Sequence, residues 1–480
     1  MAEGGDATGP RRAHNRAMQQ DLERSGRVRR ALGLAVLALV AAGCGDGPPV
    51  PPPAKNLVLI SLDTLRADRL GCYGYARPTT PELDRFAAAG ARFREASAPS
   101  PWTKPSHASL FSGLYPHRNG VLGFEYPLSK DVPHIAELLR ARGFQTGAVV
   151  SNSVLTLHGL ERGFEHFEFV ERPKGPGPST VTEHALAWLG ARDRARPFFA
   201  FVHYNDAHAD YESLPEAQAE FVRPYQGIAN GKARQLFAHA LGLVRLAPED
   251  GRHLSDLYDA GVHQLDQQLA PLFAYLEREG LFRDTLVVVT SDHGEEFLEH
   301  GGVQHGLAQY EESVRVPLLV RAPGYPAGLA LEGAVSLVDV LPTCLELLGA
   351  AVPPALDGVS LRARLLGAEP PREPRALYFE ADCAVPDLEE SAVLQPGSTR
   401  AIRVGAFKLH HELDSGETRL YDLARDPGET VDVRGQRPEL ADALLEDLLR
   451  FLRQDARTVT PLALSPEEIE RLRELGYAGD

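Results

Sequence analysis

The sequence predicts an α/β fold: a large, mostly parallel sheet sandwiched by helices, followed by a small α+β subdomain with an antiparallel sheet. Two observations carry this prediction. Between residues 56 and 348, continuous apolar, β-branched runs alternate with amphipathic helical patterns, as in parallel sheets covered on both faces. After residue 365, apolar and polar residues alternate instead, which is typical of antiparallel strands.

Composition narrows the functional classes. The 480 residues are 43% hydrophobic and 24% charged, as in an ordinary globular protein. A formal charge of −16, with no basic stripe or nucleic-acid motif, argues against a nucleic-acid partner. The cysteines are too few for a disulfide framework and lack zinc-ribbon spacing; Cys72, Cys344 and Cys383 are expected in the core.

The first 43 residues predict an export signal of the lipoprotein type. Basic residues 27–30 precede an apolar run, 31–40, that is too short to span a bilayer. Small residues then lead to Cys44, whose position resembles the lipid-modified cysteine of bacterial lipoproteins. We expect a cell-envelope protein of the periplasm or outer membrane, anchored at Cys44. A plain signal peptide or an uncleaved anchor is the alternative, because Ala41 stands where such signals usually carry leucine.

Residues 44–55 form a Gly/Pro linker, and the catalytic domain is expected at 56–365. Its first strand, residues 56–62, ends in Asp63. The later elements are expected in this order: helices at 81–89 and 132–142, strands at 144–151 and 197–203, a helical pattern at 254–279 interrupted at Pro271, a strand at 285–291, and further elements at 316–321 and 336–348.

Residues 285–291 form the central apolar run, and Asp292 and His293 stand at its carboxyl end. Ligands of open α/β sheets bind outside the carboxyl ends of strands, and a carboxylate beside an imidazole makes half of a metal site. Asp63 repeats this arrangement, and His305 follows in a loop rich in glycine and acid. The alternative is that Asp292 caps a turn and His293 lies on the surface.

Thr103 stands at the start of another expected helix. Prolines confine the preceding segment to a loop, and residues from Ser106 to Gly113 read as helical. Threonine just ahead of a helix N-terminus meets free N–H groups that favour anions. A metal that lowers the pKa of its hydroxyl would make it a nucleophile. An ordinary N-cap or turn threonine is equally consistent with the local sequence.

Residues 366–455 predict the α+β subdomain. Strands are expected at 376–380, 401–411 and 418–423, with an Asp-Ser-Gly turn at 414–416 that supports a hairpin. A helix at 438–454 would cover one face. The tail, residues 456–480, contains a short capped helix at 465–476.

Taken together, these segments resemble the sulfatase family of the alkaline phosphatase superfamily, over nearly all of the chain after the linker. Several matching segments in the right order are more specific than any one of them. They are residues 59–66, 71–74, 102–118, 202–208, 258–260, 290–295, 315–318, 336–342, 420–423 and 426–429.

The resemblance implies a single catalytic divalent metal held by Asp63, Thr103, Asp292 and His293. Attack by Thr103 would form a covalent threonyl intermediate that water then resolves. His208 and His305 would bind substrate oxygens, protonate the leaving group or bind a second ion.

Departures from the family pattern indicate the chemistry. Sulfatases carry Cys-x-Pro-Ser-Arg, whose cysteine is oxidised to formylglycine; here residues 103–107 read Thr-Lys-Pro-Ser-His. No formylglycine is expected, because the β-carbon of threonine already carries a methyl group. Thr64 replaces the second of the paired aspartates, and residues 151–153 replace a Lys-x-His. The charges that bind sulfate are therefore reduced.

The remaining pattern resembles the threonine-nucleophile branch of the superfamily, which contains phosphodiesterases and phospho-head-group transferases. Those enzymes usually use zinc or manganese, so these ions are favoured over calcium or magnesium. We expect a metal-dependent hydrolase of sulfate or phosphate esters, leaning to phosphoesters and phosphodiesters. The substrate partner would be a small-molecule, glycan or lipid ester.

Three rival functions stay open. A conventional sulfuric ester hydrolase is the first. A phospho-head-group transferase is the second, although such enzymes carry several membrane helices and this sequence has no apolar span after residue 43. A non-catalytic glycan-binding lipoprotein is the third, and the four retained metal positions argue against it.

Secondary candidates have structural alternatives. Lys104 and His107 would contact substrate, or be a solvated lysine and a helix-capping histidine. Asp206 would bind a second metal or cap its loop. The acidic run of Glu295, Glu296, Glu299 and His300 is expected to be a solvated face, and structural roles are expected for Lys408, His410 and His411.

Overall fold

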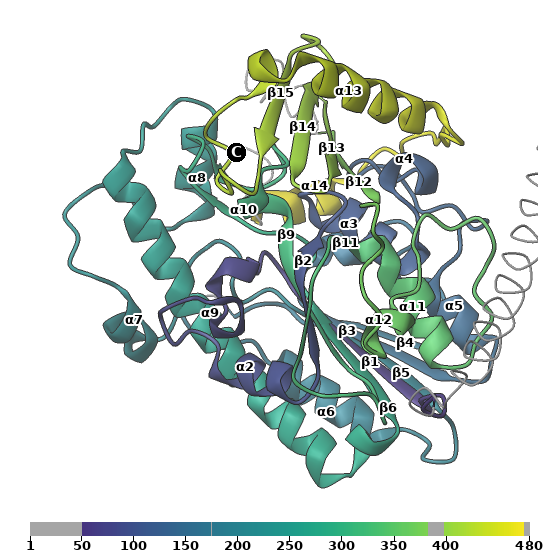
Figure 1. Cartoon of the computed structure of the whole chain (residues 1–480). Helices are drawn as coiled ribbons and strands as arrows, with labels where there is room; N and C mark the ends of the chain where they lie inside the picture. Colours follow the sequence, from purple (N-terminus) through teal and green to yellow (C-terminus); the bar gives the residue numbers. More distant parts are fainter. Residues whose placement is uncertain (1–49, 174, 383–397, 475–480) are drawn as a thin grey trace, which may run out of the picture. The chain divides into compact units, whose positions relative to one another are not determined.

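A nine-stranded sheet forms the centre of the molecule in the computed structural model, which describes residues 50–173, 175–382 and 398–474 (Figure 1). The described residues from Pro51 onward belong to one compact unit. The strands, in spatial order, are β10 (Leu329–Leu331), β2 (Ala91–Ser97), β9 (Arg315–Arg321), β6 (Thr285–Thr290), β1 (Asn56–Leu62), β5 (Phe198–Tyr204), β3 (Gln145–Val150) and β4 (His166–Phe169), with β11 (Val335–Ser336) beside β2.

The sheet is mostly parallel, as predicted. β1 pairs in parallel with both β5 and β6, and β3 continues the parallel set between β5 and β4. β9 is the exception, because it runs antiparallel to β6 on one side and to β2 on the other. The carboxyl ends of β1, β5 and β6 therefore meet at one edge, which is where ligands bind in such sheets.

Helices cover both faces of the sheet (Figure 1). Alternate residues of β1 point to opposite faces: Leu57 and Leu59 join one hydrophobic core, and Val58 and Ile60 join the other. The first core includes α3 (Thr103–Ser112), α5 (Ile135–Arg140), α11 (Val340–Leu347) and α12 (Arg362–Leu365). The second includes α2 (Pro81–Ala88), α6 (Val181–Ala191), α8 (Ala233–Ala240) and α9 (Pro248–Arg278).

Shorter elements complete the catalytic part. They are α4 (Pro116–Asn119), α7 (Pro215–Phe221), the hairpin of β7 (Glu296–Phe297) and β8 (Val303–Gln304), and α10 (Glu311–Val314); a C-terminal helix, α14 (Pro466–Glu474), follows later. No helix of the described residues is long and apolar enough to cross a membrane. The expected signal segment, Cys44 and Cys383 lie outside the described residues; Cys344 is buried and Cys72 half-buried.

The prediction that Pro271 interrupts the long helix is wrong. α9 runs unbroken for 31 residues, from Pro248 to Arg278, with Pro271 inside it. Proline removes one hydrogen bond from a helix interior, but burial of the residues around it outweighs that loss. Leu269 and Leu272 are fully buried against the sheet.

The C-terminal subdomain is a four-stranded antiparallel sheet of β12 (Ala376–Ala381), β13 (Thr399–Val404), β14 (Phe407–Glu412) and β15 (Thr418–Asp422). The single strand expected at 401–411 is two strands joined by a turn at Gly405, whose φ of +60° favours glycine. The predicted hairpin is confirmed, with Gly416 in the turn between β14 and β15. α13 (Pro438–Arg453) covers one face, as predicted.

A buried ionic network joins this subdomain to the catalytic part. The Nζ of Lys408 on β14 lies 2.9 Å from Glu311 Oε1 of α10 and 3.2 Å from Glu429 Oε1. His410 Nε2 lies 2.9 Å from the same Glu429 oxygen. Lys408 and Glu429 are 0% and 1% exposed, so the structural role expected for Lys408 and His410 agrees with the geometry.

Replacing Lys408 with methionine should lower the free energy of unfolding by about 3–5 kcal/mol, because it leaves buried Glu429 without its cation. Urea unfolding followed by circular dichroism measures the loss. Lys130→Met, at an exposed lysine, is the control and should change stability by less than about 0.5 kcal/mol. A loss below about 1 kcal/mol in Lys408→Met would mean that the network contributes little.

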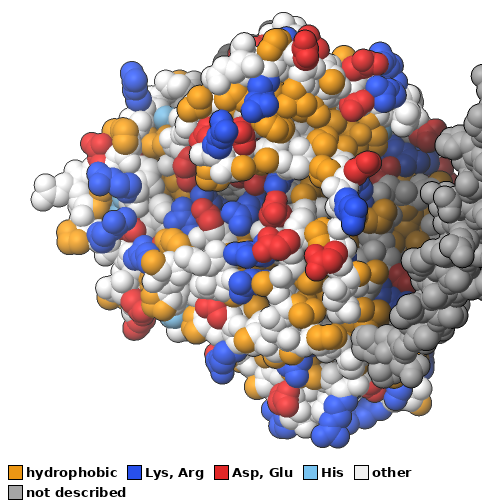
Figure 2. Space-filling model, in the orientation of Figure 1, with side chains coloured by type: hydrophobic (Ala, Val, Ile, Leu, Met, Phe, Trp, Pro, Cys, Tyr) orange, Lys and Arg blue, Asp and Glu red, His pale blue; other side chains and the backbone are white. Residues whose placement is uncertain are grey.

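Figure 2 shows one face of the molecule. Acidic and basic side chains are interspersed on it, and no continuous basic stripe crosses it. This distribution gives no surface of the kind that binds a nucleic-acid backbone on that face.

Candidate active site

The predicted metal-binding side chains meet at the carboxyl edge of the sheet. Asp63 follows β1, Asp292 and His293 follow β6, and Thr103 begins α3. All four are fully buried. Ligand atoms of Asp63, Asp292 and His293 lie within 4.8 Å of one another.

Helix α3 begins at Thr103 rather than at the expected Ser106. Pro105 fits in this first turn, because the N–H that proline lacks would have no partner there in any case. Thr103 Oγ1 lies 3.1 Å from His293 Nε2. The other ring nitrogen of His293, Nδ1, donates to the Gly294 carbonyl at 2.9 Å, which leaves the lone pair of Nε2 facing the hydroxyl.

The two aspartates each present one oxygen without a hydrogen-bond partner among the described residues: Asp63 Oδ1 and Asp292 Oδ2. Their other oxygens are fixed. Asp63 Oδ2 accepts from Asn152 Nδ2 at 2.8 Å, and Asp292 Oδ1 accepts from the backbone N–H groups of His293 at 3.0 Å and Thr64 at 3.3 Å. Two buried carboxylates facing one space can both stay ionised only with a cation between them.

The pKa values of the two carboxyls move in opposite directions. Burial, and then the charge of Asp63, raise the pKa of Asp292 well above its ordinary value. Burial also opposes ionisation of Asp63, but the adjacent imidazole of His203, with smaller contributions from His208 and His293, holds its pKa far below the ordinary value. A divalent ion would allow both groups to ionise.

The residues present therefore fit a divalent metal. Two carboxylates, the Nε2 of His293 and the hydroxyl of Thr103 supply oxygen and nitrogen ligands of the kind that zinc, manganese, magnesium or calcium accept. The unpartnered oxygens of Asp63 and Asp292 are the observation that supports this fit.

His208 and His305 are brought to the same site. Their ring centroids lie 5.0 Å apart, and the His305 ring lies 4.3 Å from that of His293. Backbone and carboxylate partners orient them: His208 Nδ1 lies 2.6 Å from the Ala209 carbonyl, and His305 Nδ1 lies 2.9 Å from Glu295 Oε1. Burial lowers the pKa of both, to about 4 for His305, so both are neutral at pH 7.

Lys104 is not the solvated lysine that was one of its two expected roles. It is buried rather than solvated, and its ammonium donates to the Phe124 carbonyl. Burial lowers the pKa of Lys104 to about 7. The geometry gives its ammonium a structural partner, the Phe124 carbonyl.

His107 holds the first turn of α3 in place through its two ring nitrogens. Its Nδ1 lies 2.8 Å from the Thr103 carbonyl and its Nε2 lies 2.9 Å from Ser61 Oγ, so both ring nitrogens are already occupied. The side chain is fully buried, so neither ring nitrogen is left to bind a substrate in this arrangement. It links the first turn of α3 to β1 instead.

The acidic run after β6 is not the solvated face that we expected. Glu295 and Glu296 are 0% and 7% exposed, and Glu299 Oε1 lies 2.6 Å from the Nη1 of buried Arg66. Burial raises the pKa of Glu295 to about 8. These acids fold back because Arg66 and the histidines give them partners that the linear sequence does not reveal.

His300 also has a buried partner, Glu312, 2.5 Å from its Nδ1. Burial alone would lower the pKa of His300, but the hydrogen bond and charge of Glu312, with a smaller contribution from Glu296, raise it to about 9 from 6.5. The folded protein therefore binds this proton more tightly than the unfolded chain does. The resulting stabilisation is complete below pH 6.5 and is lost as the pH rises through 9.

We expect Glu312→Gln to cost about 1–2 kcal/mol of stability at pH 6, after allowance for solvent screening of this half-buried pair. At pH 9.5 the difference from the wild-type protein should be at most about half as large, because His300 is then mostly neutral. Denaturant titrations at the two pH values measure it. An equal difference at both would contradict the charged pair.

Asp206 serves the structure of its loop. It accepts hydrogen bonds from the Ser179 backbone N–H at 3.0 Å, the Ser179 hydroxyl at 2.8 Å and the Gln268 amide at 2.8 Å. With its oxygens occupied in this way, it fits the loop-capping alternative rather than a second metal.

Two site residues escaped sequence reasoning. His203, at the end of β5, is fully buried with Nε2 3.3 Å from Asp63 Oδ2, and neither ring nitrogen has a hydrogen bond within the described structure. Asn152, which follows β3, fixes Asp63. The rule that identified Asp63 and Asp292, polar residues at carboxyl ends of parallel strands, would have found both.

Thr64 has an unusual backbone for a β-branched residue, with φ of +59°. Tyr258 holds it in place: its hydroxyl donates to the Thr64 carbonyl at 2.7 Å and accepts from the Arg66 N–H at 3.0 Å. This conformation directs the Thr64 N–H to Asp292 Oδ1.

Comparison with known proteins gives the family. The family model "Sulfatase" matches residues 55–350, which is more than half of the chain and contains every metal-binding residue named above. The chain belongs to the sulfatase family. A second model, "N-sulphoglucosamine sulphohydrolase, C-terminal", matches residues 299–455 and so covers the antiparallel subdomain.

Relatives of this sulfatase-family chain include human arylsulfatase A (Homo sapiens), 29% identical over 91% of this chain and 94% of that protein. A "multifunctional alkaline phosphatase superfamily protein" of Trinickia caryophylli is 27% identical over 68% of this chain and 80% of its own length. The crystal structure of a phosphonate monoester hydrolase of Agrobacterium radiobacter has the same fold, with a TM-score of 0.69, 23% identity, and coverage of 87% of this chain and 99% of that one. The protein is accordingly an ester hydrolase of a metal-dependent family.

Proposed function

We propose that this protein is a metal-dependent phosphoesterase of the sulfatase family, favouring phosphodiesters, with Thr103 as its nucleophile. The observation that carries the proposal is the position of the Thr103 hydroxyl, in the first turn of α3 and 3.1 Å from His293 Nε2. Its β-methyl group excludes formylglycine, so the hydroxyl itself must attack. The named activities of the relatives span sulfate and phosphonate esters, which is compatible with such a site.

The chain's own groups account for most of the reaction. The Thr103 hydroxyl loses its proton to the surrounding solvent as its oxygen attacks the phosphorus, the bond to the leaving oxygen breaks, that oxygen takes up a proton to leave as an alcohol, and a threonyl phosphoester forms. The first-turn N–H groups of α3 favour the negative charge of the substrate. Neutral His208 and His305 contact the non-bridging or leaving oxygens, and water then hydrolyses the threonyl ester.

Asp63, Asp292, His293 and Thr103 would hold the metal. When bound, the ion polarises the ester and lowers the pKa of the threonine hydroxyl. We propose zinc or manganese, with calcium or magnesium as alternatives. The four proposed ligands include an imidazole, which zinc and manganese accept, and Thr64 stands where the family carries a further aspartate beside Asp63. We further propose that the protein is exported and lipid-anchored at Cys44.

A conventional sulfatase is the second candidate, since a named relative is an arylsulfatase. The two activities are separated by an assay of the full-length, detergent-purified protein. It is stripped of metal and reloaded in turn with zinc, manganese, calcium or magnesium. Nitrophenyl sulfate, nitrophenyl phosphate and bis-nitrophenyl phosphate are then compared. Diester turnover that requires zinc or manganese supports the proposal, and a preference for the sulfate contradicts it.

A transferase or a glycan-binding protein would give different results. A transferase would give mainly the product in which the phosphoryl group has passed to an added acceptor alcohol, whereas a hydrolase would give mainly the product of attack by water. A binding protein would show no turnover and would retain no metal after dialysis.

A further inference from the structure

The tail after α13 crosses the segment that follows the proposed nucleophile. We call residues 455–474 of this tail, which end in helix α14, the C-terminal strap. The backbone N–H of Arg457 donates to the His117 carbonyl at 2.8 Å, and that of Leu462 donates to the Glu125 carbonyl at 2.9 Å. Both carbonyls belong to the chain between α3 and α5. The strap is therefore fastened along the segment that leaves the nucleophile's helix.

One side chain anchors the strap. Leu472 of α14 is 1% exposed, and between residues 455 and 472 it is the only side chain that is buried. It belongs to a small hydrophobic cluster, separate from the two cores that cover the sheet, with Trp102, Phe124, Val154 and Leu157. Because it docks through this one cluster, α14 can detach without unfolding the sheet.

Trp102, in this cluster, immediately precedes Thr103 and is the N-cap residue of α3. An N-cap residue usually fixes the first turn of a helix with a side-chain oxygen, but Trp102 makes no such hydrogen bond. Its ring packs instead, 4.3 Å from the Phe124 ring between centroids, and the residue is 3% exposed. The position of the first turn, and with it the Thr103 hydroxyl, therefore depends on the packing of Trp102.

Phe124 holds the other neighbour of the nucleophile. Its carbonyl accepts a hydrogen bond from the ammonium of Lys104, the residue after Thr103. Phe124 thus contacts Trp102 through its ring and Lys104 through its carbonyl. Since Leu472 packs in the cluster that contains this ring, loosening the cluster would release the chain on both sides of Thr103.

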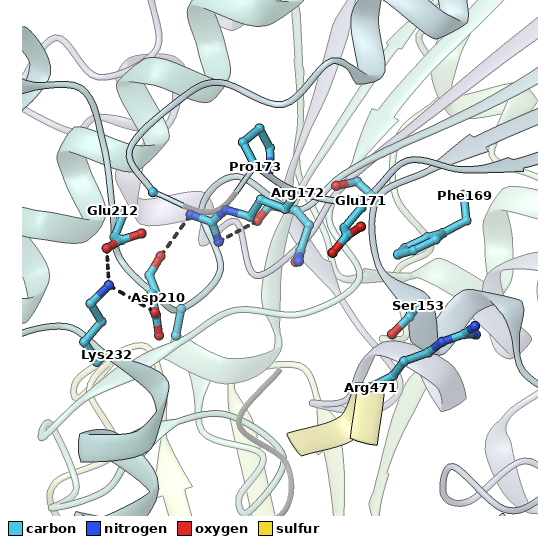
Figure 3. Close-up of a pocket in the computed structure, with 13 residues that line it drawn as sticks. Ser153, Phe169, Glu171, Arg172, Pro173, Asp210, Glu212, Lys232 and Arg471 are labelled. Atoms are coloured by element: carbon cyan, nitrogen blue, oxygen red, sulfur yellow. Dashed lines mark hydrogen bonds and ion pairs between the residues drawn. The ribbon is translucent and has the colours of Figure 1, made fainter. Parts of the chain in front are cut away.

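The cluster also reaches the support of a metal-binding carboxylate. Val154 belongs to a short 3-10 helix whose N-cap is Asn152. The Asn152 side chain accepts from the Val154 N–H at 3.0 Å and donates to Asp63 Oδ2 at 2.8 Å. In Figure 3, Arg471 of α14 lies beside Ser153 of this 3-10 helix, and both line one pocket. The strap therefore lies where the nucleophile's segment and the support of Asp63 meet.

We propose that Leu472 is a positioning residue for ester hydrolysis: by packing with Trp102 and Phe124, it makes the C-terminal strap hold the Thr103 hydroxyl in place for attack. Leu472 acts through Trp102 and the first turn of α3. Misplacement of a reacting atom by about 1 Å can lower a rate by about 10²-fold, so a loosened first turn has a large effect. The inference rests on the proposed threonine mechanism and adds an element on which that mechanism depends.

Leu472→Ala should lower kcat for bis-nitrophenyl phosphate by about 10-fold and change KM by less than about 2-fold, because the groups that bind substrate remain while the attacking hydroxyl is less well placed. Leu472→Met refills most of the volume and should restore kcat to within about 2-fold of wild type. Leu462→Ala is the matched control: this leucine belongs to the same strap, is 45% exposed, and should change neither constant. Initial rates of the metal-loaded, full-length proteins measure these effects.

A double-mutant cycle separates positioning from a general loss of stability. Trp102→Ala should lower kcat by itself, and adding Leu472→Ala should cost less than about 3-fold more, because the two side chains act through one contact. The thermal midpoint of Leu472→Ala should stay within about 2 °C of wild type, since α14 undocks on its own. A wild-type kcat in Leu472→Ala, or a loss that multiplies with that of Trp102→Ala, would overturn the proposal.

Tryptophan fluorescence distinguishes failure of the strap from failure of the proposed function. The chain has two tryptophans, so Trp188→Phe leaves Trp102 as the only one. In that background, Leu472→Ala should raise acrylamide quenching of Trp102 by about 2-fold or more, and Leu462→Ala should not. Increased quenching without hydrolysis of any ester would contradict the proposed function and support the control of Trp102 by the strap. Unchanged quenching would refute the positioning role, whatever the activity.

Discussion

Thr103→Ala should lower kcat for every accepted ester by at least about 10³-fold, the loss expected when a covalent nucleophile is removed. The fall should appear in kcat, because Thr103 bonds to the reacting atom only after the substrate is bound. Thr103→Ser retains a hydroxyl in the first turn of α3 beside His293 and should keep activity within about 10-fold. Initial rates with bis-nitrophenyl phosphate and nitrophenyl sulfate measure both effects.

Metal content must be measured in the same variants, because Thr103 is also a proposed ligand. An alanine variant that retains metal but loses turnover supports a nucleophile. Mass spectrometry adds a direct test: a phosphodiester quenched during turnover should leave one phosphoryl adduct on the peptide containing Thr103. Activity that survives Thr103→Ala would eliminate the threonine mechanism.

Metal removal should destabilise the wild-type protein and have little effect on Asp292→Asn. Without a cation, Asp63 and Asp292 present two unpartnered oxygens to one buried space. Metal at about 1,000 times its dissociation constant would stabilise the folded protein by about 4 kcal/mol. Asp292→Asn replaces one carboxylate with a neutral amide. This change weakens metal binding and also removes the repulsion between the carboxylates of residues 63 and 292.

Thermal unfolding with and without a chelator measures this difference at pH 8. The wild-type protein should lose several degrees on chelation, and metal-free Asp292→Asn should melt above metal-free wild type because burial and Asp63 disfavour ionised Asp292. Asp414→Asn, in the exposed hairpin turn, is the control and should respond to chelation as wild type does. Equal chelator sensitivity in Asp292→Asn would show that the metal binds elsewhere.

Much of the fold could be predicted because its signals are local. The apolar runs of β1, β5 and β6 identify strands buried on both faces, and each places its following residues at the same edge. β2 was not predicted, because its sequence, ARFREAS, is only partly buried and carries three charged residues. The continuity of α9 through Pro271 likewise depends on packing that the local pattern does not contain.

The candidate site was likewise predictable only in part. Position along the chain was enough to select Asp63, Thr103, Asp292 and His293, because each stands at the end of a strand or the start of a helix. The surroundings of Lys104 and Glu295 were not predictable. Their burial depends on the Phe124 carbonyl and on His305, which lie 20 and 10 residues away.

The backbone at Thr64, with its positive φ, has a consequence for which side chains this position accepts. Aspartate tolerates a positive φ better than threonine does, because it is less crowded at Cβ and its side chain can bond locally. The family aspartate at this position would therefore fit the conformation that Tyr258 already holds. Thr64→Asp should therefore create a second carboxylate beside Asp63 without any rearrangement of the main chain.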